Sequence, residues 1–396
     1  MRKLLLRYNL LIVLILVVLL PGAIFVLVNM FGEKTVLKFM RSGYGLSSVT
    51  MNEYKKPQYN LKSFSTHEIQ NYLEEQLNNN LPMRSTFVRS INQLYYDIFQ
   101  KAYAHNGNII IGKDNQLFEK LYIDIYCGNN KFDNQEIDEW VQTIKFINNY
   151  YVQNGKVFIY VISPSKAEYY SEYIPNRFHC KKASGSSNYI NKLATKLKDN
   201  EIKFINGHDM MKVSTKQYAT KMFPLGGIHW NNLGATILTN AIISSINKSK
   251  DLKLPELKFD LTQTFDPKGM DKDLAALLNI YKLKKQYSVP LLDYKENINA
   301  NFPLKVVLIG SSFTSQIYSI LVENKVFSSL TRFYYFRLSK DIYQNGNTLK
   351  LNTVNVSNKE DIKDIYTADV VILEENIAAS MSNHAKLLYE TLKSKS

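Results

Sequence analysis

A pair of serines stands where an apolar run gives way to a helical pattern, in Gly-Ser-Ser-Phe-Thr at residues 310–314. The preceding Lys-Val-Val-Leu-Ile at residues 305–309 predicts a strand buried on both faces. A serine at such a strand-to-helix turn lies near backbone N–H groups that can bind an oxyanion, which suits an acyl-transfer nucleophile. The position equally suits a serine that only caps the helix. From local sequence alone, Ser311 and Ser312 could each be a nucleophile or a helix cap.

A serine nucleophile needs a base, usually a histidine, and the chain has six. His229 lies in Gly-Gly-Ile-His-Trp-Asn at residues 226–231, after paired glycines that permit close backbone approach and just before a predicted helix. His208, in Gly-His-Asp after a short predicted strand, is the second candidate. A loop histidine is also commonly a packed or surface residue, so that interpretation stays open for both.

The elements that would position these residues follow an alternating pattern of strands and helices. Strands are expected at 156–162, 202–205, 305–309, 332–337 and 370–373, and helices at 134–152, 186–198, 232–246, from about 315, and at 378–392. Two helices, 66–79 with Thr66 as N-cap and 84–102, and a hairpin at 108–118 precede them. This order predicts an α/β domain with a mainly parallel sheet and helices on both faces, interrupted by an excursion at 252–301.

The N-terminus predicts a membrane anchor. Residues 10–28 form an uncharged apolar run, about the ~20 residues that cross a bilayer. Arg2, Lys3 and Arg7 precede it, which places the N-terminus in the cytoplasm and everything after Phe31 outside. A cleaved signal peptide is the alternative, but the run exceeds the usual ~7–15 residues and no A-x-A site follows.

We therefore expect residues 1–31 to form a cytoplasmic tip and a single-pass anchor in the cell membrane. Residues 32–65 are expected to form a stalk, and residues 66–396 one extracytoplasmic domain.

Composition limits the class of partner. The net charge of +14 favours acidic partners such as nucleic acid, anionic lipid or an acidic polymer, and predicted export argues against nucleic acid. With 45% hydrophobic residues, the chain can bury a sizeable core, which argues against global disorder. Cys127 and Cys180 match no metal or redox spacing, and a disulfide between them outside the cell is one alternative. No metal or nucleotide cofactor is indicated.

These motifs together resemble the alginate O-acetyltransferase group of the SGNH hydrolase-like superfamily, which includes shorter membrane-anchored members. Such proteins carry a strand ending in a Gly-Asp-Ser-Phe type motif and, earlier, Asp-x-His-Trp-Asn followed by Gly-Ala. Here the first motif puts the nucleophile at Ser312, and the second makes His229 the base. Further matching segments are Leu-Pro-Met-Arg at 81–84, Ile-Gly-Lys at 111–113 with Leu-Phe at 117–118, Ile-Ser-Pro-Ser-Lys at 162–166 and Asp-Leu-Ala at 273–275.

Two departures concern the residues that support the nucleophile and the base. The family's triad aspartate falls two residues before the histidine, where this chain has Gly227, and Ser311 replaces the aspartate beside the nucleophile. Asp209 and Glu375 follow predicted strands and are the candidate replacements, each also plausible as a solvated loop residue. A Ser–His dyad that works without a carboxylate, or a site that has lost its activity, would fit these departures as well.

Two further residues are candidate substrate contacts. Lys166 lies at a strand end and could approach an anionic substrate, or be an ordinary surface lysine. Trp230 is a candidate because it follows His229 in the family motif.

The resemblance implies a flavodoxin-like SGNH fold and O-acetyl transfer to hydroxyls of a surface polysaccharide through acetylated Ser312. The acetyl donor would be a membrane-embedded acyltransferase partner. An esterase that removes acetyl groups with the same residues is one rival, and a non-catalytic polysaccharide-binding or assembly factor is another.

Overall fold

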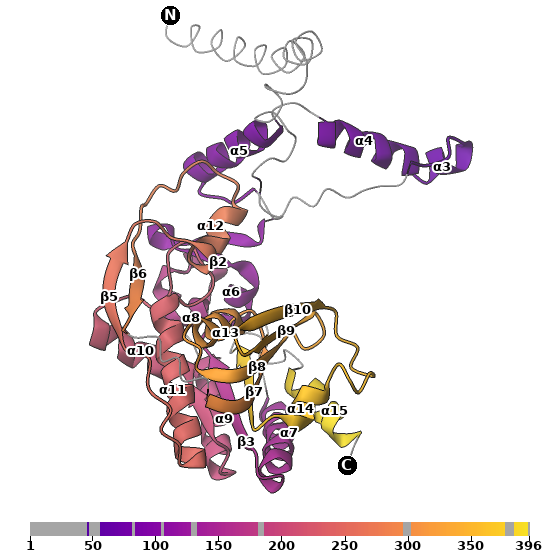
Figure 1. Cartoon of the computed structure of the whole chain (residues 1–396). Coiled ribbons are helices and arrows are strands. Elements are labelled where there is room, and N and C mark those ends of the chain that lie inside the picture. The colour runs from indigo at the N-terminus through magenta and orange to yellow at the C-terminus, as the bar shows by residue number, and fades with distance from the viewer. Residues whose placement is uncertain are drawn as a thin grey trace, which may run out of the picture. The chain divides into compact units, whose positions relative to one another are not determined.

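The computed structural model describes residues 46, 56–80, 84–103, 107–127, 133–180, 186–295, 302–376 and 384–394 (Figure 1). The chain forms two compact units. One contains residues up to Gly107 together with Ala275–Lys284, and the other contains Asn108–Leu274 with Lys285–Ser396. The predicted anchor at 10–28 lies outside the described residues, as does most of the predicted stalk. Within the described segments, no helix combines the length and hydrophobicity needed to span a bilayer.

The first unit is helical. It contains α3 (Leu61–Ser65), α4 (Glu68–Asn80), α5 (Arg84–Leu94) and a π-helical turn η1 (Tyr95–Phe99). Segment 275–284 packs on α5, where the buried Asn92 amide donates to the Leu278 carbonyl at 3.0 Å. The expected helices are present, but the predicted N-cap Thr66 is wrong: it ends α3, because its backbone N–H bonds the carbonyls of Lys62 and Phe64.

The second unit is built on a seven-stranded sheet in the order β10-β9-β8-β7-β11-β3-β4. The strands are β3 (Val157–Ser163), β4 (Phe204–Asn206), β7 (Phe302–Gly310), β8 (Phe327–Tyr334), β9 (Ser339–Gln344), β10 (Asn347–Asn352) and β11 (Val370–Asn376). The five strands from β8 to β4 pair in parallel, whereas β9 and β10 add an antiparallel edge. The expectation of an α/β domain with a mainly parallel sheet is confirmed.

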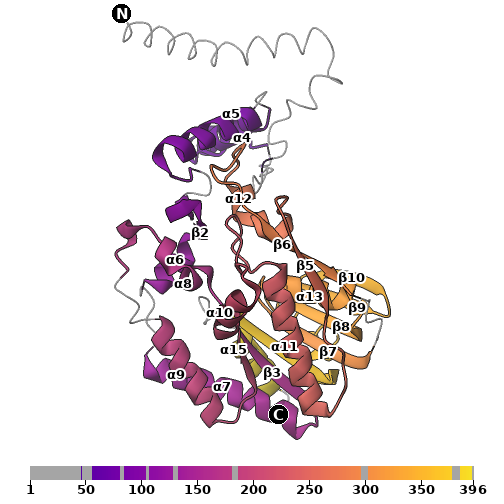
Figure 2. The same cartoon turned by 90° about the vertical axis from the view of Figure 1, so that its left-hand side faces the viewer.

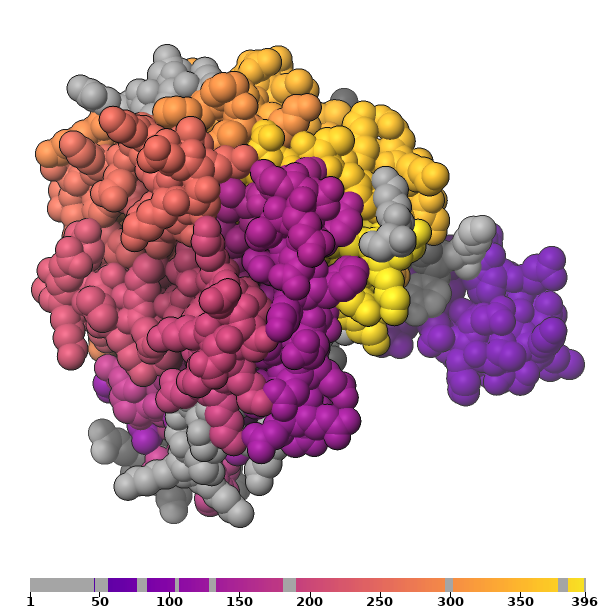
Figure 3. All heavy atoms as spheres, turned by 90° about the horizontal axis from the view of Figure 1, so that it is seen from below, coloured from indigo at the N-terminus to yellow at the C-terminus, as the bar shows by residue number. Residues whose placement is uncertain are grey.

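Helices cover both faces of this sheet, and a separate apolar core lies under each (Figures 1 and 2). One face carries α10 (Gly207–Tyr218), α11 (Asn232–Lys250) and α13 (Thr314–Glu323). The other carries α7 (Asn134–Gln153), α9 (Ser186–Asp199), α14 (Lys363–Thr367) and α15 (His384–Lys393). Figure 3 shows α7 in purple beside the yellow C-terminal helix, where the Phe146 and Tyr389 rings meet edge-on at 4.8 Å.

Smaller elements complete the unit. β1 (Ile109–Ile111) and β2 (Leu117–Glu119) form the expected hairpin around a 3-10 turn η3 (Lys113–Asn115), and α6 (Lys120–Tyr126) follows. The excursion holds the antiparallel pair β5 (Phe259–Thr264) and β6 (Val289–Tyr294). Between them lie η6 (Gly269–Lys272) and α12 (Asp273–Leu277), of which only Asp273 and Leu274 belong to this unit. The Ile228 N–H donates to Asp273, so this segment is tied to the loop before α11.

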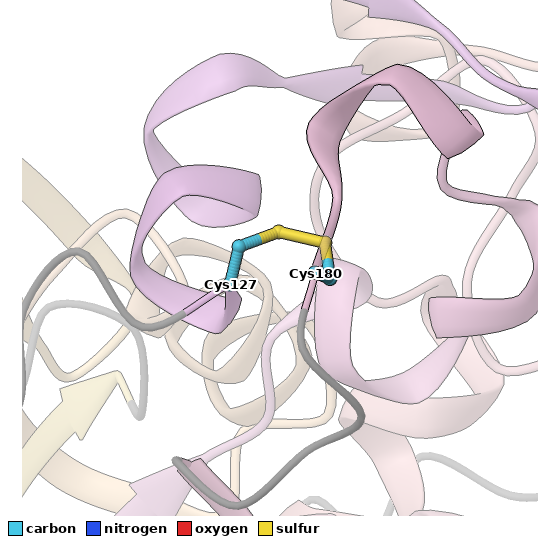
Figure 4. Close-up of a disulfide and its surroundings, with 2 residues drawn as sticks. All are labelled: Cys127 and Cys180. Carbon is cyan, nitrogen blue, oxygen red and sulfur yellow. A yellow bond between two sulfur atoms is a disulfide. The ribbon is translucent and has the colours of Figure 1, made fainter.

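A disulfide joins Cys127, at the end of α6, to Cys180 (Figure 4). Cys180 follows α8 (Lys166–Tyr169) and the 3-10 turns η4 (Ser171–Tyr173) and η5 (Asn176–Phe178). The two cysteines are 53 positions apart, and the segment between them contains α7 and β3. The disulfide thereby links the segment that follows β3 to the end of α6, and α8 in this segment packs on α6.

Candidate active site

Ser312 lies in the tight turn between β7 and α13, at the carboxyl end of a central parallel strand. Its neighbour Phe313 is buried, whereas Ser312 is only half-buried. The carbonyl of Ser312 accepts from the Ser315 N–H at 3.1 Å, which begins the helix. The N-cap of α13 is Phe313, and no side chain caps this helix, so the Ser312 hydroxyl does not act as its cap. In parallel sheets this edge is where ligands gather.

His229 reaches this serine from the loop before α11. Its Nε2 lies 2.7 Å from Ser312 Oγ, although the residues are 83 positions apart in the chain. The His229 ring also packs 4.8 Å from the Phe313 ring, which fixes its plane, and the histidine is only 7% exposed. The structure thus brings together the two residues that the sequence motifs single out.

The carboxylate at the other side of His229 is Asp273. Its Oδ2 lies 2.7 Å from His229 Nδ1, and its Oδ1 accepts from the backbone N–H groups of Ile228 at 2.8 Å and Leu274 at 2.7 Å. An ionised carboxylate only accepts, so Nδ1 carries the proton and Nε2 is left to accept from Ser312. Asp273 was not singled out as an orienting residue from sequence, although the Asp-Leu-Ala segment that contains it matches the family.

Gly227 explains why the carboxylate comes from elsewhere. A Cβ at this position would lie 2.3 Å from the Met270 carbonyl oxygen, 2.8 Å from Cγ of Pro224 and 3.1 Å from the carbonyl carbon of Asp271. The 270–273 backbone therefore occupies the space that a side chain at 227 would need. Because residue 227 has no side chain, the 270–273 backbone can pack here, and this packing places Asp273 beside His229.

Neither candidate replacement, Asp209 or Glu375, contacts His229, and both assignments are wrong. Asp209 is exposed in the first turn of α10, where its Oδ2 accepts from the Asn206 amide at 2.8 Å. Glu375 accepts from Trp140 Nε1 at 2.9 Å and the Tyr160 hydroxyl at 2.8 Å. Successive strand residues point to opposite faces, so Glu375 faces the α7 side whereas Glu374 faces Ser311.

Glu374 and Ser311 support the nucleophile's turn. The fully buried Glu374 accepts from the Ser311 N–H at 2.7 Å, from the Ser311 hydroxyl at 2.8 Å and from the Ser163 hydroxyl. Burial raises its pKa, while these hydrogen bonds act in the opposite direction. A Cβ at Gly310 would lie 2.5 Å from Glu374 Oε2, so only glycine permits this approach. Ser311 thus binds a carboxylate from the adjacent strand.

Lys166 is not available to a substrate, which corrects its assignment as a substrate contact. It is 2% exposed, and its ammonium donates to the carbonyls of Pro224 at 2.6 Å, Leu225 at 3.0 Å and Gly227 at 2.7 Å. Burial lowers the pKa of Lys166 to about 7, partly offset by the charge of Asp273. All three of its N–H donors are used on the loop that leads into His229, so it holds that loop in place.

Trp230 is also buried, with no exposed surface, and the expectation that it contacts substrate is wrong. Its ring meets Phe313 edge-on at 5.0 Å, inside the core shared by α11 and α13. It therefore packs beneath the turn that carries Ser312. His208, the second candidate base, is buried near Glu168 with its Nε2 3.9 Å away, and burial lowers its pKa to about 4. No contact joins His208 to either serine among the described residues.

Tyr335 is a second residue that sequence reasoning missed. It lies in the turn after β8, its backbone N–H donates to the Gly310 carbonyl at 2.9 Å, and its hydroxyl is 3.4 Å from Ser312 Oγ. Its φ of 44° is in the left-handed region, unusual for a tyrosine. No sequence pattern marks this residue, because the contact depends on the neighbouring strand β7.

This arrangement can carry out nucleophilic acyl chemistry. The base and the nucleophile are in hydrogen-bond contact, and a third group orients the base, which are the geometric requirements for such a site. Across the described segments, no group of three histidine, cysteine, aspartate or glutamate residues is placed to hold a metal ion.

Comparison with known proteins gives distant structural similarities only. No protein-family model and no curated protein matches the sequence. The O-acetyltransferase domain of Pseudomonas putida AlgJ is 14% identical with a TM-score of 0.44, covering 72% of this chain and 99% of that one. Bacillus cereus PatB1 with a sulfonyl adduct is 13% identical with a TM-score of 0.45, covering 69% and 94%. Pseudomonas aeruginosa AlgX is 13% identical with a TM-score of 0.43, covering 76% and 70%.

Proposed function

We propose that this chain is an O-acetyltransferase that modifies hydroxyls of an extracytoplasmic polysaccharide through an acetyl ester on Ser312. The observation that carries the proposal is the position of His229, 2.7 Å from Ser312 on one side and 2.7 Å from Asp273 on the other. The order of the motifs along the chain supports the acetyl-transfer class. The same motifs support an SGNH-like fold for the second unit.

The first step would acetylate Ser312. Its oxygen attacks the acyl carbon of an acetyl ester donor while His229 Nε2 takes the hydroxyl proton. Asp273 stabilises the imidazolium that forms and keeps Nδ1 protonated. The donor's leaving oxygen then takes the proton from His229 as its bond to the acyl carbon breaks. The Tyr335 hydroxyl lies close enough to Ser312 to donate to an oxygen of the reacting ester.

The second step would reverse these roles. A sugar hydroxyl gives its proton to His229 and its oxygen attacks the acetyl carbon, after which Ser312 leaves and regains the proton. The donor would be supplied by a membrane-embedded acyltransferase, because acetyl-coenzyme A is not found outside the cell. The apolar run at 10–28 and the preceding basic residues support a single-pass anchor with the catalytic unit outside. The Cys127–Cys180 disulfide agrees with an oxidising compartment.

The deciding experiment is direct detection of acetyl-serine. Full-length protein is incubated with p-nitrophenyl acetate, quenched in acid and digested, and the peptide with Ser312 is examined by mass spectrometry. We expect a single acetyl group on Ser312, absent from Ser312→Ala and retained in the exposed control Ser357→Ala. A folded protein that never acquires this group would overturn the proposal. Addition of an oligosaccharide acceptor separates transfer, which yields acetylated sugar, from hydrolysis, which yields only acetate.

A further inference from the structure

A cavity of about 580 Å³ lies beside the His229 loop, and none of the roles above uses it. Its lining includes Pro224, Leu225 and Asn231, which flank His229 in the chain, but neither His229 nor Ser312. Tyr287 forms another part of the wall, and its hydroxyl donates to the Asp271 carbonyl at 2.8 Å. The cavity is therefore built on the same segments that hold the base and its carboxylate. Its volume falls within the roughly 300–1,000 Å³ of small-ligand sites.

Gln116 contributes a buried polar side chain to the cavity wall. Its side chain lines the cavity and is 3% exposed, and its Oε1 has no hydrogen-bond partner among the described residues. Its backbone is fixed in the η3 turn, because its carbonyl accepts from Gly112 at 2.7 Å. The buried amide therefore forms a polar part of the cavity wall rather than a group that a ligand reaches directly.

The rim of the cavity combines amides with an exposed aromatic ring. Gln263 and Gln286 are exposed, and each amide can both donate to and accept from a hydroxyl. Phe265 is 63% exposed and offers a flat apolar surface beside them. A sugar ring presents hydroxyls around its edge and C–H groups on its faces. The side chains of this rim match both features.

The charge of the rim favours an anionic ligand. Lys221 and Lys285 line the cavity, against the single carboxylate of Asp114. Neither lysine has an ion-pair partner within the part of the chain that the structure describes. Lys285 is exposed, and Lys221 lies over the rings of Tyr170 at 5.6 Å and Tyr173 at 5.2 Å. Two ammonium groups around hydroxyl-binding amides suit a sugar with a carboxylate or phosphate substituent.

We propose that this cavity is a binding subsite for an anionic saccharide unit of the acceptor polymer, beside rather than at Ser312. The inference rests on the proposed transfer to a polysaccharide and adds the charge class of that polymer. It assigns Phe265 and Lys285 to acceptor binding, with no part in acetylation of Ser312.

Binding is measured by isothermal titration on the full-length chain carrying Ser312→Ala, which prevents turnover. The probes are a galacturonate hexamer, a phosphorylated glucan oligomer and a neutral cellohexaose. We expect an anionic probe to bind more tightly than cellohexaose, and Phe265→Ala or Lys285→Glu to weaken it about tenfold. The matched controls Leu349→Ala and Lys350→Glu, exposed on the edge strand β10, should stay within about twofold of the parent. The two anionic probes separate carboxylate from phosphate recognition.

Acetylation of Ser312 by p-nitrophenyl acetate is measured in parallel, in chains that retain Ser312. Phe265→Ala and Lys285→Glu should acetylate as the parent does, which keeps the subsite separate from the chemistry. Binding that is lost in these variants while no acetyl-serine forms in any chain would reject the proposed function and leave the subsite in place. The subsite is rejected if both variants bind the probe as the parent does, if cellohexaose binds equally well, or if no probe binds at millimolar concentration.

Discussion

Asp273 contacts His229 across 44 residues of sequence, with Oδ2 2.7 Å from Nδ1. The carboxylate is itself held by the N–H groups of Ile228 and Leu274, so it is tied both to the histidine's loop and to the start of α12. Its position is therefore set by backbone contacts rather than by side-chain packing alone.

Asp273→Asn should lower kcat for acetyl transfer by about 10²–10⁴-fold with little change in KM, because the amide cannot stabilise the imidazolium. His229→Ala should lose at least as much, since Asp273 acts on Ser312 only through His229. The matched control is the exposed Asp209→Asn, measured in the same steady-state assay. Asp209→Asn should retain the parent rate. Full activity in Asp273→Asn would show that His229 needs no carboxylate.

Gly227→Ala should destabilise the protein and slow catalysis together. The added Cβ meets the Met270 carbonyl at 2.3 Å, so the 270–273 segment must move away and take Asp273 with it. We expect a loss of about 1–3 kcal/mol in unfolding free energy, measured by urea denaturation. For the same reason, Gly227→Asp should not restore a family-type triad. An unchanged midpoint and rate in Gly227→Ala would contradict this account.

Lys166→Met should leave the carbonyls of Pro224, Leu225 and Gly227 without their donor. Buried groups left unpaired cost about 1–3 kcal/mol each, so both stability and kcat should fall. A positioning role predicts that kcat falls while KM for a small acetyl ester is nearly constant. The exposed Lys198→Met serves as control for the loss of a charge. A large rise in KM alone would instead indicate that Lys166 binds substrate.

Asp271→Asn tests the buried carboxyl next to the site. Burial, followed by the charge of Asp273, raises the pKa of Asp271 to about 7. Between about pH 4 and 7 the folded chain therefore holds a proton that the unfolded chain has released, and stability falls as pH rises through this window. Asparagine does not titrate, so the variant does not lose stability in this way. The difference in Tm between the variant and the parent should therefore shift in favour of the variant from pH 4 to 7, and change little further at pH 8. The exposed Asp266→Asn should show no such pH trend.

Tyr335→Phe should reduce kcat about three- to tenfold without altering the fold, since only the hydroxyl 3.4 Å from Ser312 is removed. Tyr334→Phe, at the adjacent last residue of β8, is the control. Circular dichroism checks that both variants fold. Equal rates in the two variants would mean that the Tyr335 hydroxyl takes no part.

Local patterns predicted the elements that depend on local sequence. The apolar run at 305–309 indicated β7, and the helical spacing after residue 231 indicated α11. The β9–β10 hairpin was not predicted, although Asn345-Gly346 is a typical hairpin turn and Leu349 and Leu351 alternate with polar residues. Because β10 is exposed along its whole length, burial does not reinforce this short pattern. Ser312 and His229 could be singled out because their motifs are short and continuous. Asp273 and Tyr335 could not be assigned roles, because each reaches the site only through packing of distant segments.

The close packing at Gly227 also has a consequence for related sequences. Backbone atoms of Met270 and Asp271 fill the volume beside residue 227, and a side chain there excludes them. An aspartate at 227 and the 270–273 segment in its present position thus cannot coexist. Homologues should therefore change these two places together during evolution, with glycine at one paired with aspartate at the other. A lineage that crossed from one arrangement to the other would pass through a form with a weakly oriented histidine.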